Sequence, residues 1–182
     1  MTDTQNSDMT IRWATPADAP HIVRLIKALA VYENEPASSV KITEADILRD
    51  GFGGDGGDGG APRRFECLIA DMAGRPVGLC LFFYNYSTWE GRAGLYVEDL
   101  FVEDIARGQG LGYKLMATLA AVALARNCRR IELSVLDWNP ARDFYHRIAM
   151  RHMNEWLPYR LDGDAIAALA RNGVPFEDSK QT

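Results

Sequence analysis

Glycine occupies every second position of a short stretch, Gly108, Gly110 and Gly112, directly before the apolar run at 113–125. A helix N-terminus carries unpaired N–H groups and a partial positive charge, and a lead-in without side chains lets those amides approach a phosphate closely. Arg107 adds a guanidinium whose fork of donors suits a pyrophosphate. The stretch therefore predicts a binding site for a phosphate-bearing ligand.

Two other nucleotide-binding motifs compete for this stretch. A P-loop needs Lys and then Ser or Thr after its last glycine, whereas Tyr113 follows Gly112, so that motif is excluded. A dinucleotide fingerprint needs the spacing GxGxxG close after a first strand, and the spacing here is GxGxG. Glu132, twenty residues after Gly112, keeps the dinucleotide interpretation open.

The elements that hold the glycines begin with a strand at 11–14 and a helix whose N-cap is Thr15, followed by Pro16. A second short helix follows Thr43 and ends at Gly51. The run of glycine and aspartate after it predicts a mobile surface loop over 51–62.

Three apolar, β-rich runs predict an antiparallel meander, at residues 65–72, 76–86 and 92–102. A long helix at 112–127, a strand at 129–136, a helix capped by Asn139 and a last strand follow, and a further helix in the tail is stopped by Gly173. This order predicts an α/β (α+β) fold, with a mixed, mostly antiparallel central sheet and helices on both faces.

Composition limits the class of protein. The chain has 182 residues, of which 47% are hydrophobic and 25% charged, as in a single globular domain. We expect it in the cytoplasm, because its start lacks a signal peptide and no apolar run is long enough to span a membrane. Its net charge of -5 argues against nucleic acid as a partner.

Cysteine and histidine usage excludes several chemistries. Cys67, Cys80 and Cys128 form no CxxC pair, so we expect them to be reduced and buried, without a disulfide framework or zinc site. No base lies next to Cys80 or Cys128 in the sequence, which argues against a covalent acyl-cysteine. The histidines have no metal-ligand spacing, so we expect no metal site and place these residues on the surface: His21, His146 and His152.

The segments VEDLFV at 97–102, RGQGLG at 107–112 and WNPARDFYHR at 138–147 resemble the Gcn5-related N-acetyltransferase (GNAT) superfamily. Together with the segments at 11–33 and 50–53, they are most similar to diamine (spermidine/spermine) acetyltransferases and thialysine-acetylating relatives. The resemblance implies a GNAT domain over 10–162, after a disordered N-terminus at 1–9 and before a helical tail at 163–182.

The resemblance implies acetyl-CoA as cosubstrate, cradled on the loop amides. It also implies that Tyr145 donates a proton to the departing CoA sulfur and that Glu98 is the base, acting directly or through a water. Because Glu98 and Asp99 are adjacent on one strand, their side chains should point to opposite faces. The cosubstrate-binding residues expected are Leu100, Phe101, Val102, Arg107, Gly108, Gln109, Gly110, Leu111, Gly112, Tyr113, Asn139, Ala141, Arg142 and Tyr145.

The expected acceptor is a small cationic primary amine held in an acidic, aromatic-lined cleft. The residues expected to line this cleft are Tyr32, Glu33, Trp89, Glu98, Asp99, Glu132, Glu155 and Trp156. The chain departs from the family pattern twice. Ala149 stands where glycine is usual, and Ser87-Thr88 stands where diamine acetyltransferases have an aspartate before the tryptophan. The second departure favours a short diamine or thialysine-like acceptor over a long polyamine.

Two alternatives remain at the level of sequence. One is a non-catalytic acyl-CoA-binding module of the same fold, which would need neither Glu98 nor Tyr145. The other is an N-acetyltransferase of a different amine, on an amino acid, an antibiotic or a protein. Relatives of this type imply a homodimer.

Overall fold

The computed structural model describes residues 9–53 and 62–174, which fall into two compact units divided between Arg142 and Asp143. The expected disordered N-terminus lies outside these residues except for Met9, which begins the first strand. Most of the expected mobile loop at 51–62 also lies outside them, and its first two residues instead complete a helix.

The first unit is built on one five-stranded sheet in the order β1-β2-β3-β4-β5. The meander is confirmed, since β1 to β4 pair antiparallel with their neighbours, and β5 pairs parallel to β4. Ala73 and Gly74, both with positive φ (51° and 72°), form the tight turn between β2 and β3. The strands are β1 (Met9–Trp13), β2 (Glu66–Met72), β3 (Arg75–Ser87), β4 (Arg92–Val102) and β5 (Ile131–Leu133).

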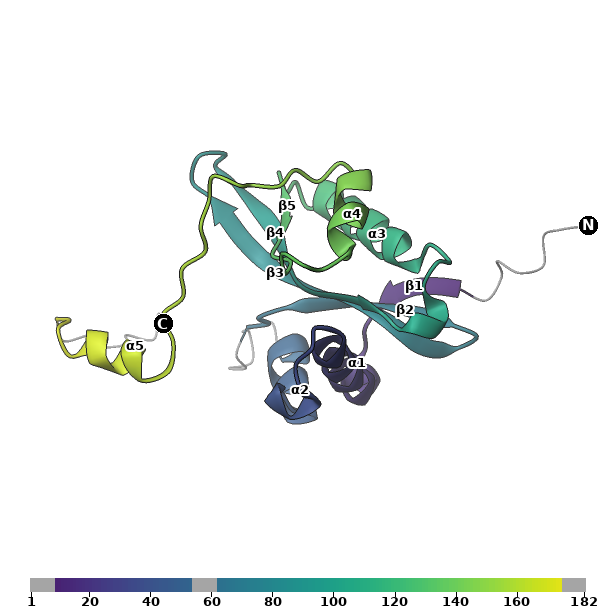
Figure 1. Ribbon diagram of the computed structural model, residues 1–182, viewed down its shortest axis with the longest axis horizontal. Coiled ribbons are helices and arrows are strands. Elements are labelled where there is room, and N and C mark those ends of the chain that lie inside the picture. Colours follow the sequence, from purple (N-terminus) through teal and green to yellow (C-terminus); the bar gives the residue numbers. More distant parts are fainter. Residues whose placement is uncertain (1–8, 54–61, 175–182) are drawn as a thin grey trace, which may run out of the picture. The chain divides into compact units, whose positions relative to one another are not determined.

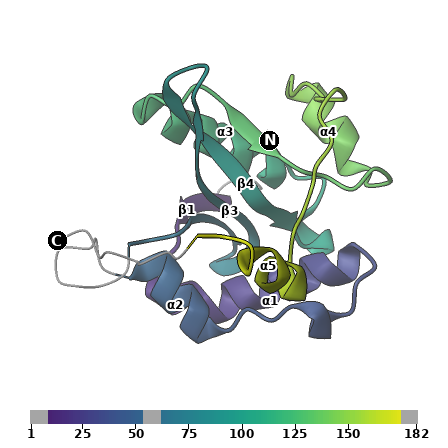
Figure 2. The same ribbon diagram turned by 90° about the vertical axis from the view of Figure 1, so that its left-hand side faces the viewer.

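Helices cover both faces of this sheet, as predicted. Figures 1 and 2 show α1 (Ala19–Tyr32) and α2 (Glu44–Phe52) on one face and α3 (Leu111–Ala125) on the other. The sheet residues that α1 and α2 bury are apolar and alternate along their strands. The buried cluster on this face includes Ile22, Leu25, Ile47, Ile69, Leu79, Leu81 and Phe101.

The helices begin where the sequence predicts. A 3-10 turn at Pro16–Asp18 leads into α1, and the Asp18 carboxylate accepts from the Thr15 backbone N–H (2.7 Å). Arg12 on β1 also donates to Asp18 and to Asp71 on β2, which ties the start of α1 to the sheet. At α2, the Asp46 N–H donates to the Thr43 hydroxyl (3.2 Å).

A β-bulge interrupts the pairing of β3 with β4. Leu81 is paired with Asp99 and Phe82 with Val97, so Glu98 is an extra residue without a partner on β3. Such a residue breaks the alternation of side chains and bends the strand. The β4–β5 pairing covers only Leu95–Val97 and Ile131–Leu133, so it ends where the bulge begins. From the bulge to Val102, β4 pairs with β3 alone.

The second unit begins within α4 (Ala141–Arg147) and contains α5 (Gly163–Ala170), which confirms the tail helix. The last strand predicted after α4 is wrong, because residues 151–162 form no strand and are exposed. Pro158 lacks the N–H that a ladder position requires.

The family's missing glycine has a structural explanation in this unit. Ala149 has a φ of 64°, and its N–H donates to the His146 carbonyl just after α4. This is the left-handed position that ends many helices and that glycine adopts without steric cost. The backbone turn is therefore kept although its residue type has changed.

Candidate active site

The glycine loop forms an open surface at the N-terminus of α3. Gly108 and Gly110 have φ values of 74° and 80°, so their backbone conformation itself calls for glycine. Gly112, inside the helix, has no such requirement. A Cβ added at Gly112 would meet no atom of the described residues within 4 Å, apart from its own helix backbone and chain neighbours. Neither backbone strain nor packing against the described residues requires glycine at this position.

The other predicted loop residues divide between surface and core. Gln109 and Tyr113 are exposed, and the Gln109 amide donates to the Ile105 carbonyl (3.3 Å). Leu111 is buried at 1% exposure, so only its backbone can serve a ligand. The loop thus offers backbone amides and a side-chain-free surface, which fits a pyrophosphate.

Arg107 and Tyr32 lie together beside the end of β4. The guanidinium carbon of Arg107 is 4.3 Å from the centroid of the Tyr32 ring, and its Nε donates to the Val102 carbonyl (2.9 Å). The Tyr32 ring is 6.2 Å from that of Phe101, and its hydroxyl donates to Asn139 Oδ1 (3.4 Å). Tyr32 was predicted for the acceptor cleft, yet its contacts are with residues predicted to bind the cosubstrate.

Asn139 caps the helix that follows β5. Its Oδ1 accepts from the Ala141 N–H (2.9 Å), and the Arg142 side chain donates to the Asp137 carbonyl (2.7 Å). Asn139 is 6% exposed, and its hydrogen bond to the Ala141 N–H caps the N-terminus of α4.

A pocket of about 550 Å³ opens beside the bulge, on the face of the sheet that carries α1 and α2. Both Glu98 and Asp99 line it, so the expectation that they point to opposite faces is wrong. The cause is the bulge, which breaks the alternation at Glu98. The remaining lining residues are Ile26, Val40, Lys41, Ile42, Arg64, Phe65, Leu81 and Phe83.

The acids of this region have unusual electrostatics. Burial, together with the charges of Glu98 and Glu33, raises the pKa of Asp99 to about 6. Burial also raises the pKa of Glu33 above its usual value. A carboxylate whose pKa approaches neutrality and that lies beside two other acids is suited to binding a cation and to exchanging a proton.

Within the first unit, the predicted acceptor residues Glu132 and Trp89 do not line this pocket. Glu132 accepts from Asn85 Nδ2 (2.6 Å) and pairs with Arg130 Nε (2.9 Å), so its charge is already engaged. Trp89 is 92% exposed in the turn between β3 and β4. Glu155 and Trp156 are exposed residues of the second unit.

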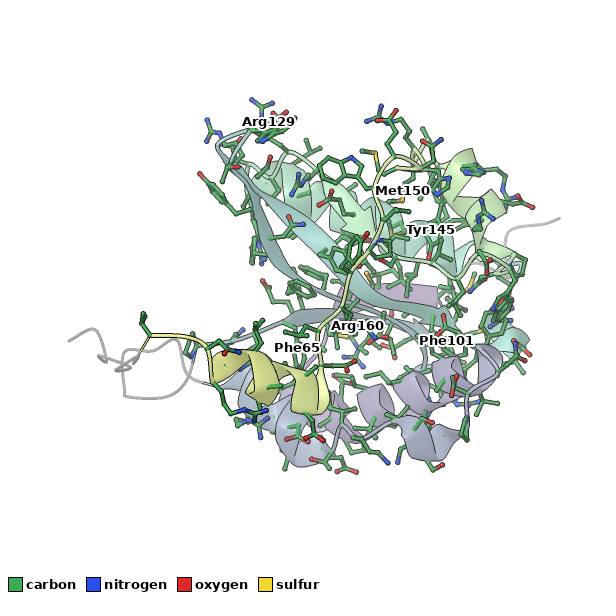
Figure 3. All side chains as sticks on the ribbon, turned by 60° about the vertical axis from the view of Figure 1, so that its left-hand side comes forward. Phe65, Phe101, Arg129, Tyr145, Met150 and Arg160 are labelled. Atoms are coloured by element: carbon green, nitrogen blue, oxygen red, sulfur yellow. The ribbon has the colours of Figure 1, made fainter. Side chains whose placement is uncertain are left out.

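Sequence reasoning missed most of the pocket wall. Phe65 lines the pocket and packs on the buried cluster that contains Phe101, and Figure 3 shows both on the side of the sheet that faces α1 and α2. Alternation along β3 from Leu81 would have placed Phe83 on that face. Lys41 and Arg64 belong to no sequence motif, and only the fold brings them to the same pocket.

Tyr145 lies on α4, in the second unit, where it is half-buried. Its ring is 5.3 Å from that of Phe144. The proton-donating role implied for Tyr145 stays a prediction.

The cysteines are free, as expected, and Cys67 and Cys80 are buried. Cys128 is only half-buried, because it lies just after the end of α3. Burial raises the pKa of Cys80 to about 12, so its thiol is a poor nucleophile. His21, His146 and His152 are exposed. Within residues 9–53 and 62–174, no group of three His, Cys, Asp or Glu side chains could hold a metal ion.

No helix in the described part of the chain has both the length and the apolar character needed to cross a membrane. Residues 26–150 match the model of the acetyltransferase (GNAT) family. Thialysine N-epsilon-acetyltransferase of Bos taurus is 38% identical, over 88% of this chain and 96% of its own length. Spermidine/spermine N(1)-acetyltransferase-like protein 1 of Homo sapiens is 33% identical, over 93% of this chain and 25% of its own.

The fold also matches solved structures. An integron cassette protein from the mobile metagenome of V. cholerae superimposes with a TM-score of 0.72 at 22% identity, covering 92% of this chain and all of that one. This likeness shows that the mixed sheet with helices on both faces is a shared architecture.

Asp99→Asn should stabilise the protein at pH 7.5. The pKa of Asp99 is raised in the folded state, so its ionised form lowers stability above about pH 6, and this cost disappears as the pH falls toward 3.8. Two pKa units at 1.36 kcal/mol each amount to about 3 kcal/mol. Thermal unfolding at pH 7.5 should therefore show a higher midpoint for the variant, and the gain should shrink at pH 5. Glu90→Gln, at an exposed acid in the turn between β3 and β4 that does not act on Asp99, is the control. A lower midpoint for Asp99→Asn at both pH values would contradict the assignment.

Proposed function

The chain belongs to the GNAT acetyltransferase family, and from that premise we propose that it transfers the acetyl group of acetyl-CoA to a small cationic primary amine. As a member of the family it is an N-acetyltransferase. The finer proposal is that the acceptor is a diamine, a polyamine or a thialysine-like compound.

The main observation in favour of an acetyl-CoA site is the open space over Gly112. The loop before α3 presents N–H groups without side chains, and nothing in the described fold accounts for the missing Cβ at Gly112. A pyrophosphate held by these amides would lie against the positive end of the helix dipole. The stretch of β4 from Leu100 to Val102, which lacks a partner on its β5 side, would hydrogen-bond the pantetheine arm as an added strand does.

The acids at the bulge support a cationic acceptor. Glu98, Asp99 and the nearby Glu33 place negative charge beside an apolar wall, where the attraction for an ammonium is stronger than in water. Two relatives carry the names of thialysine and of spermidine and spermine, which are compounds with more than one amino group.

The proposed reaction is direct transfer. The pair formed by Glu98 and Asp99 removes a proton from the ammonium, with Glu98 as the predicted acceptor, directly or through a water. The free amine attacks the thioester carbon, and the N–H groups of Leu100 and Phe101 stabilise the oxyanion. The positively charged nitrogen of the adduct loses one of its two protons to solvent, the C–S bond breaks to give the neutral amide, and the CoA thiolate takes a proton from Tyr145. The buried, weakly acidic Cys80 is not needed as a nucleophile.

We also propose that the protein acts in the cytoplasm as a homodimer. The two buried free thiols fit a reducing compartment. Exposed apolar side chains of the second unit offer a surface for a second copy: Trp156, Leu157, Tyr159, Leu161 and Leu169. Sedimentation velocity at micromolar concentration should give twice the chain mass of 20.3 kDa, and a monomer would contradict the dimer.

Gly112→Val tests the cosubstrate site. The valine side chain fills the space over the loop, while its helix propensity exceeds that of glycine, so folding should be kept. We expect the Kd for CoA, measured by calorimetry, to rise roughly tenfold or more, the worth of one charge-assisted hydrogen bond. Ala120→Val, at an exposed position further along α3, should bind CoA normally. Unchanged CoA affinity in a folded Gly112→Val would remove the loop from the site.

Tyr145→Phe tests whether Tyr145 donates the proton to the CoA thiolate. The change removes one hydroxyl and little volume, so turnover should fall by a factor on the order of ten to ten thousand, while CoA binding is retained. Release of free thiol from acetyl-CoA with a panel of amines gives the rate, and release with any amine excludes a non-catalytic module. Turnover equal to that of the wild type would make Tyr145 a structural residue.

A further inference from the structure

Arg107 directly precedes the glycine loop, and the fold restrains its side chain. Its Nε donates to the carbonyl of Val102 (2.9 Å), the last residue of β4, and its Nη1 lies 2.5 Å from Asp104 Oδ1. The guanidinium carbon is 4.3 Å from the centroid of the Tyr32 ring and 5.4 Å from that of Phe101. The guanidinium therefore lies at the junction between β4 and the glycine loop, the two elements that would hold the proposed cosubstrate.

The ring of Tyr32 is the contact best suited to fix the orientation of this guanidinium. The Asp104 side chain is 82% exposed, and an ion pair at such a position contributes little in water. The Val102 carbonyl holds only Nε, so the guanidinium could still rotate about that hydrogen bond. Contact with the face of an aromatic ring restricts this rotation, because a flat guanidinium stacks on the ring.

Tyr32 is itself fixed by the core of the first unit. It is the last residue of α1, it packs against the buried cluster, and its nearest ring, Phe101, is 7% exposed. Its hydroxyl donates to Asn139 Oδ1 (3.4 Å). Tyr32 does not line the pocket that contains Glu98 and Asp99. Its contacts therefore lie with residues predicted to bind the cosubstrate and not with those that line the acceptor pocket.

We propose that Tyr32 is a positioning residue for the cosubstrate: its ring holds the guanidinium of Arg107 where it meets the pyrophosphate of acetyl-CoA. This inference rests on the proposed acetyltransferase function. A cation that is restrained before binding loses less side-chain entropy when the phosphate binds, so CoA binds more tightly. A guanidinium has five N–H donors, so Arg107 can keep its bond to Val102 and still bind a phosphate oxygen.

A double-mutant cycle on the Kd for CoA, measured by calorimetry, tests this role. Tyr32→Leu should raise the Kd roughly three- to thirtyfold, the range for a cation–π contact, whereas Tyr32→Phe keeps the ring and should bind CoA as the wild type does. Arg107→Met should raise the Kd about tenfold or more. Adding Tyr32→Leu to Arg107→Met should cause no further loss, because the ring acts through Arg107. An equal loss from Tyr32→Leu in both backgrounds would overturn the proposal, since Tyr32 would then only support the fold.

Tyr86→Leu is the matched control, because it removes a tyrosine of β3 that is 64% exposed, and it should leave the Kd for CoA unchanged. Far-UV circular dichroism establishes that each variant folds. If Tyr32→Leu does not fold, Tyr32→Met, which keeps more of the side-chain volume, takes its place in the cycle.

Steady-state kinetics separate this role from binding of the acceptor. In Tyr32→Leu the KM for acetyl-CoA should rise, while the KM for the amine, measured at saturating acetyl-CoA, should stay at the wild-type value. A rise in the KM for the amine alone would overturn the proposal and return Tyr32 to the acceptor cleft. If the wild type does not bind CoA, the proposed function fails and this role fails with it. If the wild type binds CoA but the cycle shows no coupling, the positioning role alone fails.

Discussion

One extra residue in β4 determines how the chemistry of this fold is arranged. Glu98 has no partner on β3, so the side chains of Glu98 and Asp99 line the same pocket instead of opposite faces of the sheet. The pairing of β4 with β5 stops at Val97, immediately before the bulge. A single irregularity in the ladder therefore places two acids in one pocket next to a strand edge that can receive an extended ligand.

The two halves of the proposed site depend on different interactions. The cosubstrate half depends on backbone N–H groups and on the absence of side chains at Gly108, Gly110 and Gly112. The acceptor half depends on side-chain charge held against an apolar wall, where burial keeps the pKa of Asp99 at about 6. Folding tolerates that unfavourable carboxylate because the buried cluster under α1 and α2 is large and apolar. The free-energy cost of ionising Asp99 falls when a cation binds beside it.

Much of the fold follows from local sequence signals. Thr15 with Asp18, Thr43 with Asp46, and Asn139 each begin a helix where the residue types predict, and apolar runs gave the meander. The bulge could not be predicted, because it is a matter of register between two strands and no residue type marks it. The hydrogen bond between Asn85 and Glu132 also depends on which strands are neighbours. Gly94 on β4 has no side chain, so Asn85 on β3 reaches across it to Glu132 on β5. The strand expected after α4 failed because a strand needs a partner edge as well as a suitable sequence.

The central claim is that the acids at the bulge bind the ammonium of the acceptor, and the protonation of Asp99 reports this most directly. The carboxyl carbon of Asp99 can be followed by ¹³C NMR across a pH titration, with Asp99→Asn providing the assignment. Without acceptor, the resonance should titrate with a pKa of about 6. With saturating lysine and no acetyl-CoA, the pKa should fall, because a bound ammonium stabilises the carboxylate. An identical titration curve with and without lysine would contradict the account.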